Sequence, residues 1–257
     1  KVVVITGGTS GIGASIARAV VREGGKAFIT GIVESEGNAL VKELGANSSL
    51  CIADLGDPAS PAKIAAACVA AFGRIDSLVN CAAIFDQSNV ENLKYENYLR
   101  MMQININAPL FVIQACMPEL KKNKGAVLNI GSVNAHAGEA NLLAYSMSKG
   151  AMVTMTRNLG NALGVAGVRV NQINPGWILT DREKLMKIEQ GLGDEIIFST
   201  ILHDFVNTEI QIILECDHRM VEIYQRTFSK FEVRGSLINP NNYPVVSDFD
   251  EHCPIGS

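Results

Sequence analysis

The segment YSMSK places two side chains with acid-base chemistry, Tyr145 and Lys149, four residues apart. Side chains at this spacing share one face of a helix. A phenol with a pKa of about 10 transfers protons poorly at neutral pH, but a nearby ammonium stabilises the phenolate and lowers that pKa. Surface helices also produce such pairs by chance. Ser132 ends the apolar run AVLNIGS thirteen residues earlier, and its presence favours a general acid-base centre.

A glycine-rich segment, TGGTSGIG at residues 6–13, follows an apolar run and precedes a helical pattern. Its glycines at positions 7, 11 and 13 would let the backbone approach a pyrophosphate held at a helix N-terminus. A plain tight turn also explains the spacing. The position between a strand and a helix favours phosphate binding.

These residues need elements that hold them in place, and the chain supplies strands and helices in alternation. Six short apolar segments, each closed by a turn or polar signal, are typical of buried strands: residues 2–6, 26–31, 50–55, 75–80, 126–132 and 168–176. Helical faces between them include Ile12, Ile16 and Val20 in one segment, and Ile64, Cys68 and Phe72 in residues 62–72. Such alternation predicts an α/β fold, a Rossmann-like, doubly wound parallel sheet with helices on both faces. Ligands of such sheets bind beyond the carboxyl ends of the strands.

Composition limits the classes of function. The chain has 257 residues, of which 47% are apolar and 19% charged, and its net charge is −4. This acidic balance gives no basic surface for nucleic acid or anionic lipid, and no apolar run reaches the roughly 18 residues of a membrane span. We therefore expect a cytoplasmic protein with no nucleic-acid or membrane partner. The six cysteines have no metal-binding spacing and predict reduced thiols rather than disulfides or a metal site: Cys51, Cys68, Cys81, Cys116, Cys216 and Cys253.

Composition changes near residue 196. Residues 1–195 contain 26 alanines and 21 glycines, whereas residues 196–257 contain no alanine and two glycines. The later segment holds nine acidic and four basic residues, so it carries all of the net acidity. This change marks either a separate structural unit or a sequence of different origin.

Taken in order, the motifs from Lys1 to about Glu195 resemble those of the short-chain dehydrogenase/reductase family. The resemblance implies an NAD(P)-dependent oxidoreductase acting on CH–OH groups, with a small alcohol or ketone substrate. It makes residues 1–195 a dinucleotide-binding and catalytic domain and leaves residues 196–257 as an atypical C-terminal segment. It implies a catalytic tetrad of Asn105, Ser132, Tyr145 and Lys149. The cofactor-binding residues that it implies are Gly7, Ser10, Gly11, Ile12, Gly13, Asp54, Leu55, Asn80, Ala82, Tyr145, Lys149, Pro175, Gly176 and Thr180. The segment NCAA departs mildly from the family's Asn-Asn-Ala-Gly at Cys81 and Ala83.

The resemblance also assigns roles. Tyr145 would exchange a proton with the substrate hydroxyl, and Ser132 would donate a hydrogen bond to the substrate oxygen. Lys149 would tune Tyr145 and hold ribose hydroxyls. Asn105 would retain a water that relays the proton, although it could equally satisfy the backbone of a kinked helix.

The choice between the two dinucleotides depends on the end of the second strand. Related NAD enzymes carry an acid there for the ribose 2′-hydroxyl, but this chain has Gly31. A cation for a 2′-phosphate is also missing, because Ile32 and Val33 are apolar and Ser10 stands where NADP enzymes often have one. Glu34 would repel a phosphate. We therefore favour NAD over NADP.

The substrate loop between Ser132 and Tyr145 offers many hydrogen-bonding groups: Asn134, His136, Glu139 and Asn141. They would suit a polyhydroxylated substrate such as a sugar or polyol, unless they are simply solvated. Residues 181–195, with Gly191 and Gly193, fall where the family has its mobile substrate lid.

The C-terminal segment lacks the Thr-Gly turn and Asp-Gly-Gly string that surround the family's usual seventh strand. Residues 209–215 could supply a replacement strand, yet helical spacing also occurs there, at Phe198, Ile201, Phe205 and Ile210. By resemblance we expect a homo-oligomer, a dimer or tetramer, weakened if this ending is not native. A catalytically silent NAD(P)-binding scaffold remains the alternative to an active enzyme.

Overall fold

The computed structural model describes residues 1–176, 178, 213–217, 221–227, 229 and 231–236. The chain forms two compact units, Lys1–Pro175 and Gly176–Ser257. The domain boundary predicted at residues 195 and 196 lies outside the described residues, and it stays a prediction.

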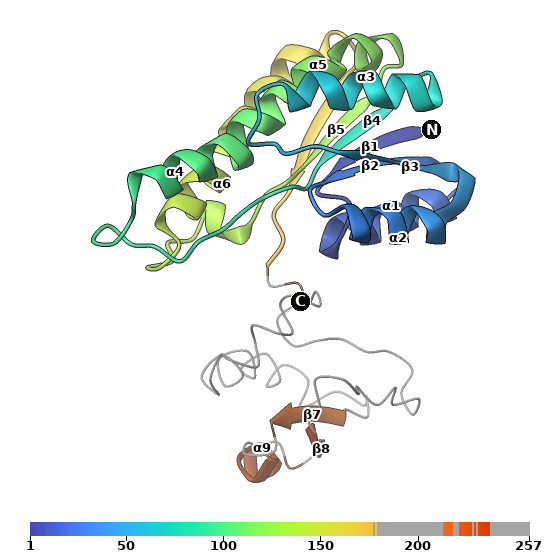
Figure 1. The fold of residues 1–257 in the computed structure, drawn as a ribbon. Helices are drawn as coiled ribbons and strands as arrows, with labels where there is room; N and C mark the ends of the chain where they lie inside the picture. The colour runs from blue at the N-terminus through green and yellow to red at the C-terminus, as the bar shows by residue number, and fades with distance from the viewer. Residues whose placement is uncertain (177, 179–212, 218–220, 228, 230, 237–257) are drawn as a thin grey trace. The chain divides into compact units, whose positions relative to one another are not determined.

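The first unit alternates strands and helices as the sequence predicts (Figure 1). Its strands are β1 (Val2–Thr6), β2 (Lys26–Gly31), β3 (Ser48–Ile52), β4 (Ser77–Asn80), β5 (Ala126–Ile130) and β6 (Arg169–Ile173). Its helices are α1 (Gly11–Arg22), α2 (Glu34–Leu44), α3 (Ser60–Phe72), α4 (Tyr95–Met102), α5 (Ala108–Lys122) and α6 (Leu143–Gly164). Short helical turns occur at η1 (Gly45–Asn47), η2 (Gln103–Asn107, a π-helix) and η3 (Val133–Ala135).

All six predicted strands are present; β1 and β2 have the predicted bounds, and the other four have shifted ends. Strand β3 was expected over residues 50–55 but begins at Ser48 and ends at Ile52. Leu55 is nevertheless buried in the core, so its apolar character reflects packing of the following loop rather than strand pairing. An apolar pattern in the sequence indicates which residues are buried, and a buried residue can lie in a loop beside the sheet as well as in a strand.

The six strands form one parallel sheet in the order β3-β2-β1-β4-β5-β6. The strand order reverses beside β1, which pairs with β2 on one side and β4 on the other. Thr6, at the end of β1, lies opposite both Thr30 and Asn80. In a doubly wound sheet the crevice outside this reversal is the usual ligand position.

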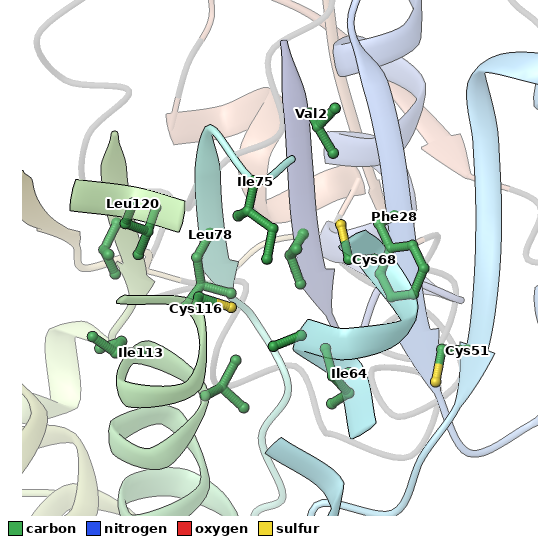
Figure 2. Packing of buried hydrophobic residues seen from close by; sticks show 14 of the residues in the cluster. Val2, Phe28, Cys51, Ile64, Cys68, Ile75, Leu78, Ile113, Cys116 and Leu120 are labelled. Carbon is green, nitrogen blue, oxygen red and sulfur yellow. The ribbon is translucent and has the colours of Figure 1, made fainter. Parts of the chain in front are cut away.

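Helices cover both faces of the sheet, which confirms the predicted fold class. Figure 1 shows α1 and α2 on one side of the strands and α3 and α5 on the other. The larger core cluster lies on the second side, where Figure 2 shows Phe28 beside Cys68 and Ile64 of α3, and Leu78 beside Cys116 of α5. The smaller cluster packs α1 and α2 on the opposite face.

Helix α1 approaches the sheet through small side chains. Its buried residues are Gly13, Ala14 and Ala17, whereas Ile16 and Val20 are only partly buried beside them. The apolar residues predicted to face the sheet, at positions 12, 16 and 20, therefore lie at the border of the contact between α1 and the sheet rather than at its centre. The predicted face of α3 is closer to the observation, because Ile64 and Cys68 are fully buried.

The described cysteines of the first unit are free thiols: Cys51, Cys68 and Cys116 are buried, and Cys81 is half-buried. Burial raises the pKa of Cys68 and of Cys116 to about 12. These thiols therefore pack as small apolar groups, as the sequence predicts.

The second unit contains a two-stranded parallel sheet, with β7 (Ile213–Asp217) and β8 (Glu232–Ser236) joined through α9 (Val221–Thr227). Tyr224 and Phe231 are buried within it. Strand β7 overlaps the segment that could replace the seventh strand, but it pairs with β8. In the described residues β6 is therefore an edge strand of the large sheet.

None of the helices in the described ranges combines the length and apolar character that a membrane span requires.

Candidate functional site

The glycine loop between β1 and α1 is packed so closely that side chains do not fit. A Cβ atom on Gly7 would lie 2.7 Å from the Cα of Ala82, and one on Gly13 would overlap the carbonyl oxygen of Gly7. Gly7 and Gly11 also have positive φ angles, of 62° and 51°. Glycine at these positions thus lets the loop pack closely at the N-terminus of α1, where the sequence predicts a dinucleotide pyrophosphate.

The start of the same loop, at the end of β1, is hydrogen-bonded to the segment that follows the neighbouring strand β4. The Thr6 hydroxyl accepts hydrogen bonds from the N–H groups of Cys81, at 3.1 Å, and Ala82, at 3.3 Å. Asn80 is buried and donates to Asn129 Oδ1 at 2.9 Å, while its own Oδ1 has no hydrogen-bond partner. A buried acceptor of this kind is unusual. It lies at the carboxyl end of β4, beside the predicted dinucleotide crevice.

The remaining residues predicted near the glycine loop occupy different environments. Ser10 is the N-cap of α1 but makes no side-chain capping bond, and Ile12 is half-buried in its first turn. Asp54 is exposed in the loop after β3, where its Oδ1 accepts from Gly56 N at 2.8 Å. Leu55 is part of the core. Of these, Ser10 and Asp54 offer exposed polar groups to a ligand.

Helix α6 carries Tyr145 and Lys149 one turn apart, as predicted. The Lys149 ammonium lies 5.6 Å from the centre of the Tyr145 ring and donates to Ile130 O at 2.7 Å. Lys149 is only 2% exposed, and burial lowers its pKa to about 8, while the nearby Cys81 thiol acts in the opposite direction. Burial thus disfavours the ammonium form of Lys149, while the position of Nζ places that charge, when present, beside the phenol.

Ser132 is buried in an extended conformation just after β5, and its Oγ accepts from Asn134 N at 3.1 Å. The hydrogen bonding of β5 to β6 continues past both strand ends, with Val133 N donating to Pro175 O at 3.0 Å. Pro175 therefore lies beside the Ser132 segment. Gly176 follows it and is exposed, whereas Thr180 lies outside the described residues.

Asn105 lies in the π-helical turn η2 between α4 and α5 and is completely buried. Its Oδ1 accepts from Ile84 N at 2.9 Å, and its Nδ2 donates to Ile84 O at 2.8 Å and to Ser148 Oγ at 3.0 Å. Ser148 in turn donates to the carbonyl of Tyr145 at 2.7 Å. Asn105 thus links the segment after β4 to α6 and, in these contacts, does not bond to the backbone of its own helix. The water relay stays a prediction.

The structure shows a line of polar contacts that sequence reasoning missed. Asn129 donates to Thr156 Oγ1 at 2.9 Å, and Thr156 lies 2.9 Å from Gln172 Oε1. Gln172 donates to Asn174 Oδ1 at 2.5 Å, and Asn174 Nδ2 lies 3.2 Å from His136 Nε2. This line joins β5, α6 and β6 to the substrate loop. An asparagine in the middle of the apolar run AVLNIGS was the available signal, because a buried amide needs partners.

Phe85 is a second residue that sequence reasoning missed. Its ring meets the Tyr145 ring edge-on, with centroids 6.3 Å apart and an interplanar angle of 71°. Such a contact restricts the tyrosine ring. In the rest of the substrate loop, His136, Glu139 and Asn141 are exposed and Asn134 is half-buried.

Comparison with known proteins agrees with this geometry. The family model described as short chain dehydrogenase matches residues 1–190. An uncharacterised oxidoreductase of Thermotoga maritima is 33% identical over 188 residues, which cover 72% of this chain and 73% of that protein. L-rhamnose 1-dehydrogenase (NAD(P)(+)) of Azotobacter vinelandii is 33% identical, over 74% of this chain and 78% of its own.

A solved structure, a blue fluorescent protein from a metagenomic library in complex with NADPH, matches with a TM-score of 0.67. It is 37% identical, and the match covers 70% of this chain and 76% of that one. These matches confirm the extent of the resemblance along the first three quarters of the sequence.

Proposed function

Since this chain belongs to the short chain dehydrogenase family and is an oxidoreductase that binds NAD(P), we propose that it oxidises a secondary alcohol or reduces the corresponding ketone with Tyr145 as general acid-base. The observation that carries the proposal is the buried Lys149 ammonium held 5.6 Å from the Tyr145 ring. A cation at that position favours the phenolate and lowers the cost of moving a proton at neutral pH.

The dinucleotide would lie with its pyrophosphate at the N-terminus of α1, in the loop that Gly7 and Gly13 allow to fold tightly, because a Cβ at either position would collide with protein backbone. When bound, the nicotinamide supplies the hydride chemistry. Tyr145 Oη takes the hydroxyl proton during oxidation and returns one to the alkoxide oxygen during reduction. The proton and the hydride thus leave from the oxygen and the carbon of the same CH–OH group.

Ser132 supports this transfer through the orientation of its hydroxyl. Its Oγ already accepts a hydrogen bond from Asn134 N, so its hydrogen is available to a substrate oxygen. A donor fixed in this way stabilises the charge that develops on that oxygen. Lys149 uses one of its three hydrogens on Ile130 O, and the others would reach the ribose hydroxyls.

We propose a polyhydroxylated substrate, a sugar or polyol. The loop after Ser132 presents amide and imidazole groups, and one relative is named as a rhamnose dehydrogenase. The test is hydride transfer, followed at 340 nm, with L-rhamnose, other sugars, polyols, hydroxysteroids and 3-hydroxyacyl thioesters. Each is offered with NAD and with NADP. Turnover of the sugars or polyols above the others is the expected result, and turnover of a different class would refute this substrate assignment.

The panel also separates an enzyme from a silent scaffold. If the chain binds a dinucleotide but turns over no member of the panel, the scaffold alternative replaces the catalytic proposal. The intact set of Asn105, Ser132, Tyr145 and Lys149 supports the enzyme.

NAD as the preferred cofactor, self-association and a cytoplasmic location belong to the same proposal. Exposed apolar side chains on two neighbouring helices, Leu99 on α4 and Leu110 and Phe111 on α5, support a homo-oligomer. The free buried thiols support a reducing compartment.

A further inference from the structure

We propose that Glu36, in the first turn of α2, is the acid that selects NAD over NADP in this chain, by accepting a hydrogen bond from the ribose 2′-hydroxyl and repelling a 2′-phosphate. The inference rests on the proposed function, since it assumes that a dinucleotide occupies the crevice at the glycine loop. In this proposal Glu36 takes the role of the acid that is missing at the end of β2. It also takes the role that the sequence analysis gave to Glu34, the repulsion of a 2′-phosphate.

An acid at the end of β2 would force the Thr9 side chain to move in this chain. A Cβ on Gly31 would lie 2.6 Å from Cγ2 and 2.7 Å from Oγ1 of Thr9. The loop is held in this place because Gly8 N donates to Thr30 O at 2.9 Å. The Thr9 side chain therefore fills the space from which a carboxylate at position 31 would have to extend.

The same threonine brings a carboxylate from another element. Thr9 Oγ1 lies 3.5 Å from Oε2 of Glu36, at the long limit of a hydrogen bond. The link places a negative charge of α2 at the glycine loop, one residue from the N-cap of α1. Glu34 belongs to the same helical turn and is exposed, but it has no hydrogen bond or ion pair in the described structure.

The charges around this position disfavour a second phosphate. Residues 7–13 and 31–37 contain two glutamates and no lysine, arginine or histidine. Ile32, at 67% exposure, and Val33 offer only apolar surface. Arg18 of α1 is engaged by Glu43 of α2 in a two-bond ion pair, at 2.7 and 2.8 Å. A 2′-phosphate would meet a carboxylate with no cation beside it, whereas a hydroxyl can donate to that carboxylate.

Acidic residues in a first helical turn are also favourable for the helix alone, because they face its positive end. That reading assigns Glu34 and Glu36 equal roles and predicts no effect on cofactor choice. The two residues therefore form a matched pair for an experiment, since both are exposed, both lie in the same turn, and each loses one charge on replacement by glutamine.

The experiment measures dissociation constants of NADH and NADPH by fluorescence titration of the full chain, for the wild type, Glu36→Gln, Glu34→Gln and Thr9→Val. We expect Glu36→Gln to lower the ratio of the NADPH constant to the NADH constant by about tenfold, the effect of one hydrogen bond to a charged group. Thr9→Val should lower it in the same direction by less. Glu34→Gln should leave it within about twofold. The wild-type ratio should also fall as salt is raised, because salt screens exposed charges.

Equal effects of the two glutamine variants would overturn the assignment and leave a general helix-charge effect. An unchanged ratio in Glu36→Gln, with both dinucleotides still bound, would overturn this inference alone. Failure of the wild type to bind either dinucleotide would instead overturn the proposed function together with it. Melting temperatures of the variants show that each is folded.

Discussion

The two compact units of this chain differ in how they are built. Lys1–Pro175 contains six parallel strands with helices on both faces, whereas Gly176–Ser257 contains, in its described residues, a two-stranded sheet and one helix. The first is rich in alanine and glycine, which let α1 lie close against the sheet, and no alanine occurs after residue 195. The family match ends at residue 190. The hydrogen bonds described for the catalytic candidates all lie within the first unit.

This difference separates the chemistry from the ending of the chain. In the described residues β6 has one strand partner, and Ile173 on it is 53% exposed. An edge strand of this kind is open to pairing with another chain, a known hazard of uncovered edges. Ser132, Tyr145 and Lys149 all lie in the first unit, so we expect that unit to determine proton transfer and the second unit to affect stability and assembly. The predicted cofactor residues Gly176 and Thr180 belong to the second unit.

The largest effect is expected from Tyr145→Phe, which removes the proton-transfer group. Turnover should fall by about 100-fold to 10,000-fold while NADH affinity stays within severalfold, because general acid-base catalysis by one side chain has this size. Steady-state kinetics and fluorescence titration provide the two measurements. Tyr224→Phe in the second unit is the matched control and should leave turnover unchanged. Wild-type turnover in the Tyr145 variant would place the chemistry elsewhere.

Next in size is the effect of the buried charge of Lys149 on stability. Its folded pKa of about 8 lies below its ordinary value of 10.5, so the unfolded chain binds the proton more tightly between these pH values. Wild-type stability attributable to Lys149 therefore rises with pH across this window. The stability of Lys149→Met relative to wild type should fall by at most about 3 kcal/mol from pH 8 to 10.5.

The measurement is urea unfolding at several pH values, with Cys81 replaced by alanine and Tyr145 by phenylalanine in both proteins, because both side chains interact with Lys149. Other buried thiols are common to both proteins and cancel. Arg226→Met in the second unit should show no such pH dependence, since arginine stays charged. A pH-independent difference for Lys149→Met would mean that its burial does not alter its protonation.

A smaller effect is expected from Gly7→Ala at the cofactor crevice. Its Cβ would lie 2.7 Å from the Cα of Ala82, so the loop must shift and dinucleotide affinity should fall by about tenfold or more, the consequence of overpacking. Gly45→Ala is the control, because Gly45 also has a positive φ, of 69°, but open space around its Cβ position. Equal titration curves for the two variants would show that close packing at Gly7 is not what binding requires.

The smallest effect on the site is expected from Phe231→Ala, which empties part of the second unit's core. Dinucleotide affinity should stay within about twofold, although a buried phenylalanine typically contributes about 3–5 kcal/mol to the unit that contains it. Leu78→Ala, in the core of the first unit, should reduce both stability and binding. A tenfold loss of affinity in Phe231→Ala would show that the two units are energetically coupled, and would contradict the expectation that the core of the second unit does not affect dinucleotide binding.

The sequence by itself determined the six strands, their alternation with helices, the glycine loop and the order of the catalytic motifs. These features are local, since burial of a strand shows in a short apolar run and close backbone packing shows in glycines such as Gly7 and Gly13. Local patterns also explain the errors at strand ends, because Leu55 is buried without belonging to β3.

The tertiary structure alone decided which distant side chains meet. Asn105 bonds to Ser148, 43 residues away, and thereby acts on the helix that carries Tyr145. Thr9 meets Glu36, 27 residues away, and also lies against Gly31, the position where related NAD enzymes carry an acid. No periodicity encodes such pairs. The Thr9–Glu36 pair forms because parallel strands bring the segments that follow them to one edge of the sheet, and the Asn105–Ser148 pair forms because η2 packs against α6.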